Sequence, residues 1–212
     1  MPEKEEDARA HIVFVCGVCG AGKTTVGRAL AVELGGGFLD ADDLHPPENR
    51  AKLARGTPLD GADREPWLAA VADAAAAAAA PNAIVVVACS ALKRSYRDIL
   101  RQRAGAASGA AQVDFVLLDV PEALLRARLA DAAADRSASH HPLPNALPLL
   151  PSQLATLERG GSLPDEWAAV FSEEEDGQEE ELAPAGEVAR ALAAKLRARW
   201  EAKPAASEGQ QR

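Results

Sequence analysis

The sequence predicts an α/β fold in which helices flank a central parallel sheet. Short apolar runs at residues 11–16, 83–88 and 112–120 have the length and β-branched content of buried strands. Stretches with apolar residues at helical spacing alternate with these runs, which is typical of a parallel sheet. A chain of 212 residues is long enough for one well-formed core, so we expect a single domain.

Residues 17–24 read Gly-Val-Cys-Gly-Ala-Gly-Lys-Thr and fit the pattern G-x-x-x-x-G-K-[ST] of a phosphate-binding loop. The loop lies between the first predicted strand and a predicted helix at residues 25–34, which is the order that the motif requires. Glycines let backbone N–H groups turn toward an anion, and the start of the helix adds partial positive charge. Lys23 is expected to reach the β- and γ-phosphates of ATP, and the Thr24 hydroxyl to ligate Mg²⁺. The predicted nucleotide-binding residues are Gly17, Val18, Cys19, Gly20, Ala21, Gly22, Lys23, Thr24 and Thr25.

The next predicted strand, at residues 38–43, ends in acidic residues. In a parallel sheet, ligands lie beyond the carboxyl ends of the strands, so Asp40 and Asp42 are expected beside the triphosphate. Asp40 would join Thr24 in holding Mg²⁺, and Asp42 would act as a base for a substrate hydroxyl. The alternative is a pair of solvated acids in a loop.

Residues 44–68 are dense in proline, histidine and charge, which favours an insertion of short helices that covers a substrate. A helix is expected to begin near Pro66 and to end in the alanine run at residues 74–80. His45 alone is weak support for a site, because an isolated histidine is more often structural.

A basic cluster follows the strand at residues 83–88, which is the most hydrophobic run and is expected inside the sheet. The formal net charge of the chain is −9, so an anionic substrate needs a local basic patch. Lys93, Arg94 and Arg97 would form this patch at the edge of the site. The alternative for each of them is a solvated helix face.

After the strand at residues 112–120, Pro121 predicts the start of another helix, and a lid is expected at about residues 130–150. Arg126, Arg128 and Arg136 belong to this region, and a mobile arginine-bearing lid would exclude water and neutralise charge during phosphoryl transfer. His140 and His141 have no Cys or acidic partners at ligand spacing, which disfavours a metal pair.

From residue 160 the pattern weakens. Residues 167–171 are compatible with a last edge strand, and residues 172–182 form an acidic insertion that is expected to be disordered. A final helix should pack on the sheet, because apolar residues recur every four positions from Val188 to Trp200. We therefore expect a disordered leader at residues 1–10, one domain at 11–203 and a polar tail at 204–212.

The composition limits the partners and the location. The acidic charge argues against nucleic acid or an anionic membrane as a main partner. No run approaches the roughly 20 apolar residues of a membrane span, and the acidic N-terminus is unlike a targeting leader. Cys16, Cys19 and Cys89 are expected to be free thiols, because the phosphate loop already accounts for the C-x-x-C pair. A cytoplasmic location is expected, and a homodimer is left open.

These motifs together resemble the gluconate kinases, which belong to the shikimate-kinase-like group of P-loop small-molecule kinases. The resemblance covers roughly residues 11–160. Beside the phosphate loop, it rests on Asp-Asp-Leu-His-Pro-Pro-Glu-Asn at 42–49 with Lys52, and on Cys-Ser-Ala-Leu-Lys-Arg-Ser-Tyr-Arg at 89–97. Shorter matching blocks lie at residues 56–59, 63–68 and 152–158.

The resemblance implies a nucleoside-monophosphate-kinase-like three-layer fold with a central parallel sheet and a lid. It also implies ATP-dependent phosphorylation of D-gluconate to 6-phospho-D-gluconate, a reaction of carbohydrate metabolism, with ATP and Mg²⁺ as cofactors. By position, Asp42 is similar to the acid that orients or deprotonates the sugar hydroxyl. Arg128 and Arg136 are similar to the helix and lid arginines that face the phosphates.

The resemblance also assigns residues to the substrate. Lys93, Arg97 and His45 are similar to groups around the substrate and its carboxylate. With Lys23 and Asp42, Lys93 completes the expected catalytic set.

Two regions depart from the family's pattern. The span from Arg128 to Arg136 is lengthened, and His140-His141-Pro142 stands where His-Phe is expected. An altered lid would lower turnover before it abolished ATP binding. The segment after Glu158 is diverged as well, which leaves open that the last strand is lost or poorly formed. The alternatives are a kinase for another small acid or polyol, such as shikimate, and a nucleotide-binding protein with weakened catalysis.

Overall fold

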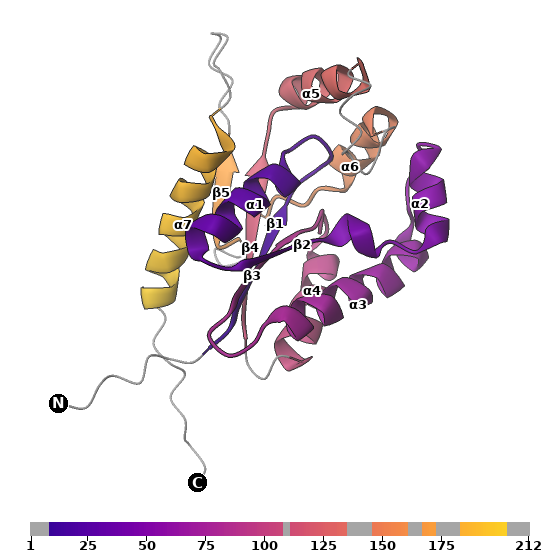
Figure 1. Ribbon diagram of the computed structural model, residues 1–212. Helices are drawn as coiled ribbons and strands as arrows, with labels where there is room; N and C mark the ends of the chain where they lie inside the picture. The colour runs from indigo at the N-terminus through magenta and orange to yellow at the C-terminus, as the bar shows by residue number, and fades with distance from the viewer. Residues whose placement is uncertain (1–8, 108–110, 135–145, 161–166, 173–182, 203–212) are drawn as a thin grey trace, which may run out of the picture.

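The computed structural model describes residues 9–107, 111–134, 146–160, 167–172 and 183–202. These residues form a five-stranded sheet in which all four pairings are parallel and the strand order is β2-β3-β1-β4-β5 (Figure 1). The strands are β1 (His11–Cys16), β2 (Gly37–Asp40), β3 (Ile84–Ala88), β4 (Gln112–Asp119) and β5 (Ala169–Ser172). The predicted α/β fold with a central parallel sheet is confirmed, and the apolar β3 is an inner strand.

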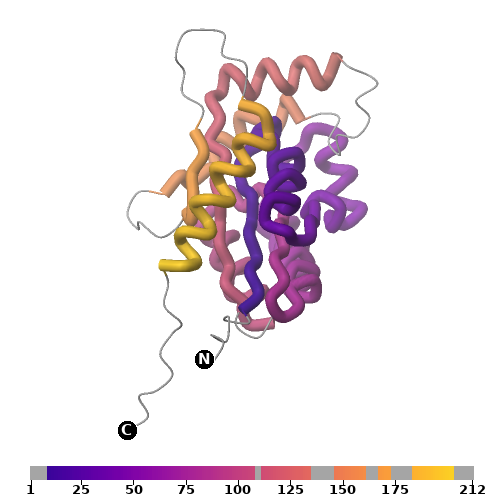
Figure 2. The backbone as a smooth tube through the Cα atoms, turned by 60° about the vertical axis from the view of Figure 1, so that its left-hand side comes forward, coloured from indigo at the N-terminus to yellow at the C-terminus, as the bar shows by residue number. Residues whose placement is uncertain are grey.

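Helices cover both faces of the sheet. Helices α1 and α7 pack together on one face, whereas α3 and α4 pack together on the other (Figures 1 and 2). The remaining helices lie toward the carboxyl ends of the strands, where α5 and α6 stand above the sheet in Figure 1. The helices are α1 (Lys23–Leu34), α2 (Pro47–Ala54), α3 (Gly61–Ala78), α4 (Arg94–Ala107), α5 (Glu122–Ala134), α6 (Leu150–Thr156) and α7 (Ala185–Ala202), with 3₁₀ turns at Ala41–Leu44 and Leu147–Leu149.

The alternation of side chains along β1 explains the three layers. Val13 and Val15 point to the core beneath α1 and α7, and Ile12 and Phe14 point to the core beneath α3 and α4. Successive side chains of a strand face opposite sides of the sheet, so a strand that is apolar at every position requires cover on both faces. All four side chains are fully buried, and each contributes about 1.5–3 kcal/mol to the stability of the fold.

The end of β2 and the start of α3 differ from the predicted positions, because side chains cap the elements there. The second strand ends at Asp40 instead of residue 43, because the Asp40 carboxylate accepts from the backbone N–H of Asp42 (3.1 Å) and starts the 3₁₀ turn. Helix α3 begins at Gly61 instead of near Pro66, because Asp60 and Asp63 form a reciprocal capping box. The helix then continues through Pro66.

The last strand is formed. Residues Ala169–Ser172 pair in parallel with Val116–Asp119 of β4, so the divergence after Glu158 has not removed the edge strand. Four predicted segments fall mainly or wholly on residues outside the described set: the leader, the middle of the lid at 135–145, the acidic insertion at 173–182 and the tail. Among the described residues, no helix is both long and apolar enough to cross a membrane.

A buried carboxylate ties α7 to the sheet near the amino ends of the strands. Asp114 of β4 is 3% exposed and accepts from Trp200 Nε1 (2.7 Å), Arg199 Nε (3.2 Å) and Gln112 Nε2 (2.9 Å). The Trp200 ring also lies against His11 of β1, with 4.0 Å between centroids. These contacts fix the end of α7 across two neighbouring strands.

We expect Asp114→Ala to lower the free energy of unfolding by about 3 kcal/mol, because it removes a buried carboxylate that accepts three hydrogen bonds, two of them from α7. Urea denaturation monitored by circular dichroism measures this loss. The matched control is Asp73→Ala, which breaks the exposed Asp73–Arg103 pair and should cost much less. Equal losses in the two variants would show that Asp114 contributes no more than a surface pair.

Candidate active site

A cleft of about 820 Å³ opens at the carboxyl ends of the strands. The phosphate loop and the start of α1 form one wall, and the end of β2 with its 3₁₀ turn forms another. Residues of α3, α5 and α6 complete the lining. The topology therefore brings the predicted loop and the predicted acids to one site, as the rule for parallel sheets requires.

The phosphate loop has the backbone that its glycines allow. Gly17, Gly20 and Gly22 have φ values of 143°, 80° and 88°, a region that favours glycine. At Gly17 a Cβ would also lie 2.8 Å from the carbonyl oxygen of Leu118. Lys23, the first residue of α1, donates from Nζ to the carbonyl of Val18 (2.9 Å) and lines the cleft.

Asp40 connects the two walls of the cleft. Its Oδ2 accepts from the Thr24 hydroxyl (2.8 Å), and its Oδ1 accepts from the backbone N–H of Asp42 (3.1 Å). A hydroxyl and a carboxylate are hard oxygen donors, so the pair suits Mg²⁺ together with phosphate oxygens and water. No group of three or more His, Cys, Asp or Glu side chains at metal-binding distance occurs among the described residues.

Asp42 lies within the 3₁₀ turn and His45 lies at its C-terminal cap, three residues later. Both side chains line the cleft. His45 Nε2 is 3.7 Å from Asp42 Oδ1, and the imidazole ring stacks on Trp67 with 4.2 Å between centroids. Trp67 in turn donates from Nε1 to the carbonyl of Ala41 (2.8 Å). Burial, with the nearby Arg50 and Arg64 guanidinium groups, lowers the pKa of His45 from 6.5 to about 4, so its imidazole is neutral at physiological pH.

Arg97 does not reach the cleft, which corrects its prediction as a substrate-binding residue. Its side chain is fully buried, donates to the carbonyls of Ala91 (2.9 Å) and Leu92 (3.2 Å), and stacks on Trp167 (4.2 Å). The residue lies on the inward face of α4, where it satisfies the backbone of the loop before the helix. Lys93, on the same segment, is not among the residues that line the cleft; its Nζ lies 5.8 Å from the centre of the Tyr96 ring.

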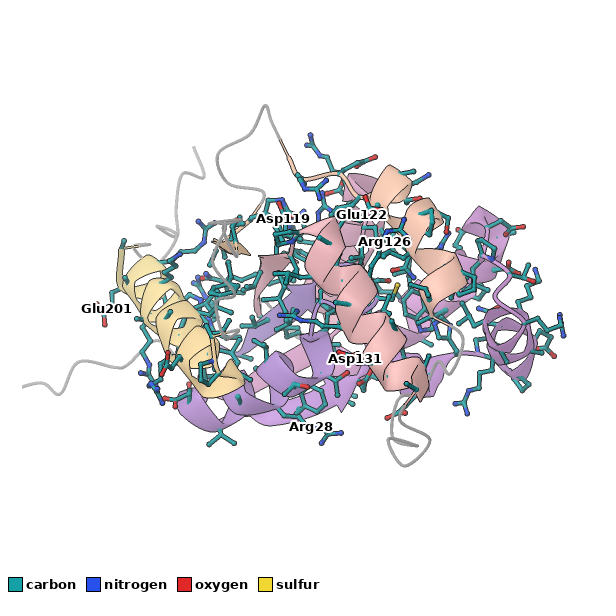
Figure 3. All side chains as sticks on the ribbon, turned by 90° about the horizontal axis from the view of Figure 1, so that it is seen from above. Arg28, Asp119, Glu122, Arg126, Asp131 and Glu201 are labelled. Atoms are coloured by element: carbon teal, nitrogen blue, oxygen red, sulfur yellow. The ribbon has the colours of Figure 1, made fainter. Side chains whose placement is uncertain are left out.

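Several side chains that line the cleft were not predicted as site residues, among them two arginines and a glutamine. The guanidinium carbon of Arg64 of α3 lies 5.7 Å from the centre of the Tyr96 ring. Arg28 of α1, labelled in Figure 3, lies over the Phe38 ring at 4.6 Å. Gln153 of α6 accepts from the backbone N–H of Cys19 (2.7 Å). Arg64 and Gln153 belong to the matching blocks at 63–68 and 152–158, so the signal was present although no role was attached to it.

Of the arginines predicted for the lid region, Arg128 lies at the cleft and Arg126 does not. Arg128 lines the cleft and donates from Nη1 to the carbonyl of Gly20 (3.4 Å). Arg126 pairs with Glu122 on the same helix at 2.6 Å, and both side chains are about half exposed (Figure 3). Arg136 lies outside the described residues, as do His140 and His141.

A second pocket of about 380 Å³ adjoins the other side of the phosphate loop. Arg128, Gly20 and Gly22 line both hollows. The rest of this pocket is formed mainly by apolar residues at the ends of β4 and β5 and at the start of α7: Leu118, Val120, Phe171, Pro184 and Val188. Its place and lining suit the base and sugar of a nucleotide whose phosphates occupy the loop.

The three cysteines are buried free thiols. Burial raises the pKa of Cys16 to about 12 and that of Cys89 well above its usual value, so neither is a reactive thiolate. Cys19 is 4% exposed and directs its thiol to the carbonyl of Ala146 (3.5 Å). The free thiols agree with the sequence-based expectation.

Known proteins share these features. Residues 12–146 match the family described as AAA domain. The thermoresistant gluconokinase of Escherichia coli (strain K12) is 43% identical over 122 residues, which cover 56% of this chain and 66% of that protein. The gluconokinase of Gluconobacter oxydans (strain 621H) is 40% identical over 159 residues, covering 75% of this chain and 82% of that protein. The crystal structure of a gluconokinase from Sinorhizobium meliloti 1021 is 35% identical, with a TM-score of 0.67 and coverage of 91% of this chain and 94% of that chain.

The extent of the match differs among relatives. The chain spans 66% of the E. coli protein and between 47% and 49% of three vertebrate relatives, so it covers about half to two thirds of the first relatives that it matches. The Gluconobacter and Sinorhizobium proteins match over most of both chains. The residues that match the family model, 12–146, contain the phosphate loop and strands β2, β3 and β4. The chain therefore belongs to the gluconokinase family of P-loop kinases.

Proposed function

We propose that this chain phosphorylates D-gluconate with ATP to give 6-phospho-D-gluconate. The observation that carries the proposal is that Asp42 lines the same cleft as Lys23, Thr24 and Asp40. A base for a hydroxyl group thereby lies opposite the groups that hold a triphosphate. The names of the family's members supply the sugar acid as the substrate.

ATP would occupy the loop and the second pocket together. The backbone N–H groups of residues 20–24 and the start of α1 would bind the phosphates, and Lys23 would leave the Val18 carbonyl to reach the β- and γ-phosphates. The adenine base of ATP would lie in the second pocket, between Arg128 and Pro184. Thr24 and Asp40 would hold Mg²⁺, which when bound neutralises charge on the phosphate oxygens.

In the chemical step the protein would position the two substrates and stabilise charge, without forming a covalent bond to either. Asp42 would accept the proton of the 6-hydroxyl as that oxygen attacks the γ-phosphorus in line with the leaving oxygen of ADP. The neutral His45 imidazole borders Asp42 without adding a positive charge beside the carboxylate. Lys23 would stabilise the charge that develops during transfer. Lys93 would act only if the segment before α4 moves toward the cleft.

The carboxylate of gluconate needs a cationic partner at the far end of the cleft, and we assign this role to Arg64. Its guanidinium lines the cleft, whereas that of Arg97 is bonded to the protein interior. A guanidinium can bind a carboxylate through two parallel hydrogen bonds, which also fixes the orientation of the substrate. His45 would border the substrate on the Asp42 side.

The proposed enzyme works in the cytoplasm, where ATP is available and reducing conditions keep cysteines as thiols.

A panel of sugar and cyclic acids tests the proposed function. In a coupled assay of ADP release, we expect turnover with D-gluconate and none with shikimate. Asp42→Asn, prepared in the same way, should lose at least about a hundredfold in kcat while ATP affinity stays nearly unchanged, which excludes a contaminating kinase. Turnover with shikimate alone, or ATP binding without turnover on any acid, would overturn the proposal in favour of the two alternatives.

Arg64→Met tests carboxylate recognition. We expect the KM for gluconate to rise at least about tenfold, because a charge-assisted hydrogen bond contributes roughly 1.5–3 kcal/mol, while the KM for ATP stays constant. Arg103→Met is the matched control, since Arg103 lies on the outer surface of α4 and pairs with Asp73. If both variants kept the wild-type KM for gluconate, another group would have to bind the carboxylate.

The lowered pKa of His45 predicts a pH-dependent stability. Between pH 6.5 and about 4 the unfolded chain binds a proton at His45 that the folded chain does not, so stability falls as pH decreases through this window. The full loss is about 3 kcal/mol. Urea denaturation of the wild type and His45→Gln at several pH values measures it as the difference between two curves. Parallel curves would contradict the burial of a neutral imidazole.

A further inference from the structure

One peptide group of the phosphate loop is held at both of its polar ends. The carbonyl of Val18 accepts from Lys23 Nζ (2.9 Å), and the N–H of Cys19, in the same peptide unit, donates to Gln153 Oε1 (2.7 Å). Gln153 is 134 residues away in the sequence, on α6, which lies beside the loop between β1 and α1 in Figure 1. Lys23 and Gln153 therefore reach the loop at the same peptide.

The hydrogen bond to Cys19 fixes which way the Gln153 carboxamide is turned. A backbone N–H can only donate, so its partner must be the carbonyl oxygen of the side chain. The amide nitrogen Nε2, with its two donors, is then the other end of the planar group. Gln153 lines the cleft, and Nε2 has no hydrogen-bond partner within the described part of the chain. Two neutral donors are thus available next to the loop.

The position of these donors indicates which part of a nucleotide they would meet. The lysine of a phosphate loop reaches the β- and γ-phosphates. In this structure Lys23 is hydrogen-bonded to the same peptide group that Gln153 contacts. Gln153 and Asp42 line the same cleft, so the terminal phosphoryl group would lie between them. During transfer, negative charge is spread over the three equatorial oxygens of that group, and preoriented donors stabilise it.

We propose that Gln153 is a further catalytic residue, which donates from Nε2 to the terminal phosphoryl group while Oε1 keeps it aligned on the loop. This inference rests on the phosphoryl transfer proposed above and assigns a role to a residue of α6. Cys19 strengthens the alignment, because its thiol points to the carbonyl of Ala146, just before the 3₁₀ turn that leads into α6. Cys19 thereby contacts this segment at two positions, Ala146 and Gln153.

Two substitutions separate the donor role from the alignment role. Gln153→Glu keeps the side-chain length and the acceptor for Cys19, but replaces the donors by a negative charge. Gln153→Leu removes both functions. Thr156→Val is the matched control, because it deletes a hydrogen bond within α6, from the threonine hydroxyl to the carbonyl of Ser152 (2.6 Å), without lining the cleft.

The readout is the affinity for ADP and for the non-hydrolysable ATP analogue AMPPNP, measured by calorimetry with Mg²⁺ and without gluconate. We expect Gln153→Glu to bind ADP nearly as the wild type does, and AMPPNP at least about tenfold more weakly, since only AMPPNP has a terminal phosphoryl group. Gln153→Leu should lower the ratio of AMPPNP to ADP affinity by a smaller factor, and Thr156→Val should leave it unchanged. In the coupled assay, kcat should fall more than KM for gluconate rises in both Gln153 variants.

Equal weakening of ADP and AMPPNP in Gln153→Leu, with both affinities restored in Gln153→Glu, would overturn the donor role and leave only alignment. If Gln153→Glu does not fold, the affinity ratio of Gln153→Leu decides: a lowered ratio supports the proposal, and an unchanged ratio refutes it. Because these titrations contain no gluconate, they keep their meaning even if the sugar-acid panel identifies another substrate.

Discussion

The carboxylate of Asp40 is the contact on which the candidate site depends. It accepts from the Thr24 hydroxyl through one oxygen and from the N–H of Asp42 through the other, at 2.8 and 3.1 Å. The first bond reaches the nucleotide wall of the cleft, and the second starts the 3₁₀ turn that carries the proposed base. Since β2 is only four residues long, a side chain at its end decides where the chain turns. The Asp40 carboxylate therefore sets the position of Asp42, the proposed general base, relative to the phosphate loop.

The cleft gathers cations in a chain whose formal net charge is −9. Lys23 and Arg28 come from α1, Arg64 from α3 and Arg128 from α5, so four positive groups from three helices border one hollow. Asp40, Asp42 and Asp43 line it as well, so the positive groups exceed the negative ones by one. The hollow is therefore more favourable to a triphosphate and a sugar acid than the acidic remainder of the surface. Burial, together with the cationic neighbours Arg50 and Arg64, lowers the pKa of His45 and keeps it neutral, so it adds no further positive charge beside Asp42.

The sequence was sufficient for the features that depend on local chemistry. Strands β1, β3 and β4 follow from apolar runs, and the loop follows from its glycines, Lys23 and Thr24. Arg97 shows where this reasoning ends: its position near the carboxyl end of a strand is correct, but only packing against Trp167 and the carbonyls before α4 turns its guanidinium inward. Gln153 could not be placed by spacing either, because its contact with Cys19 is set by the tertiary position of α6.

Stability and chemistry are concentrated at opposite edges of the same sheet. Near the amino ends, the buried Asp114 carboxylate holds α7 by accepting from Trp200 and Arg199, and residues 12–15 of β1 and 115–118 of β4 are apolar and buried. Near the carboxyl ends, side-chain hydrogen bonds join α6 to the loop, and join the 3₁₀ turn after β2 to Asp40 and Trp67. In kinases of this kind, short segments around the site are the usual ones to move when a substrate binds. A rigid sheet can thus hold the phosphates in place while the segments around Gln153 and Asp42 adjust to the bound substrate.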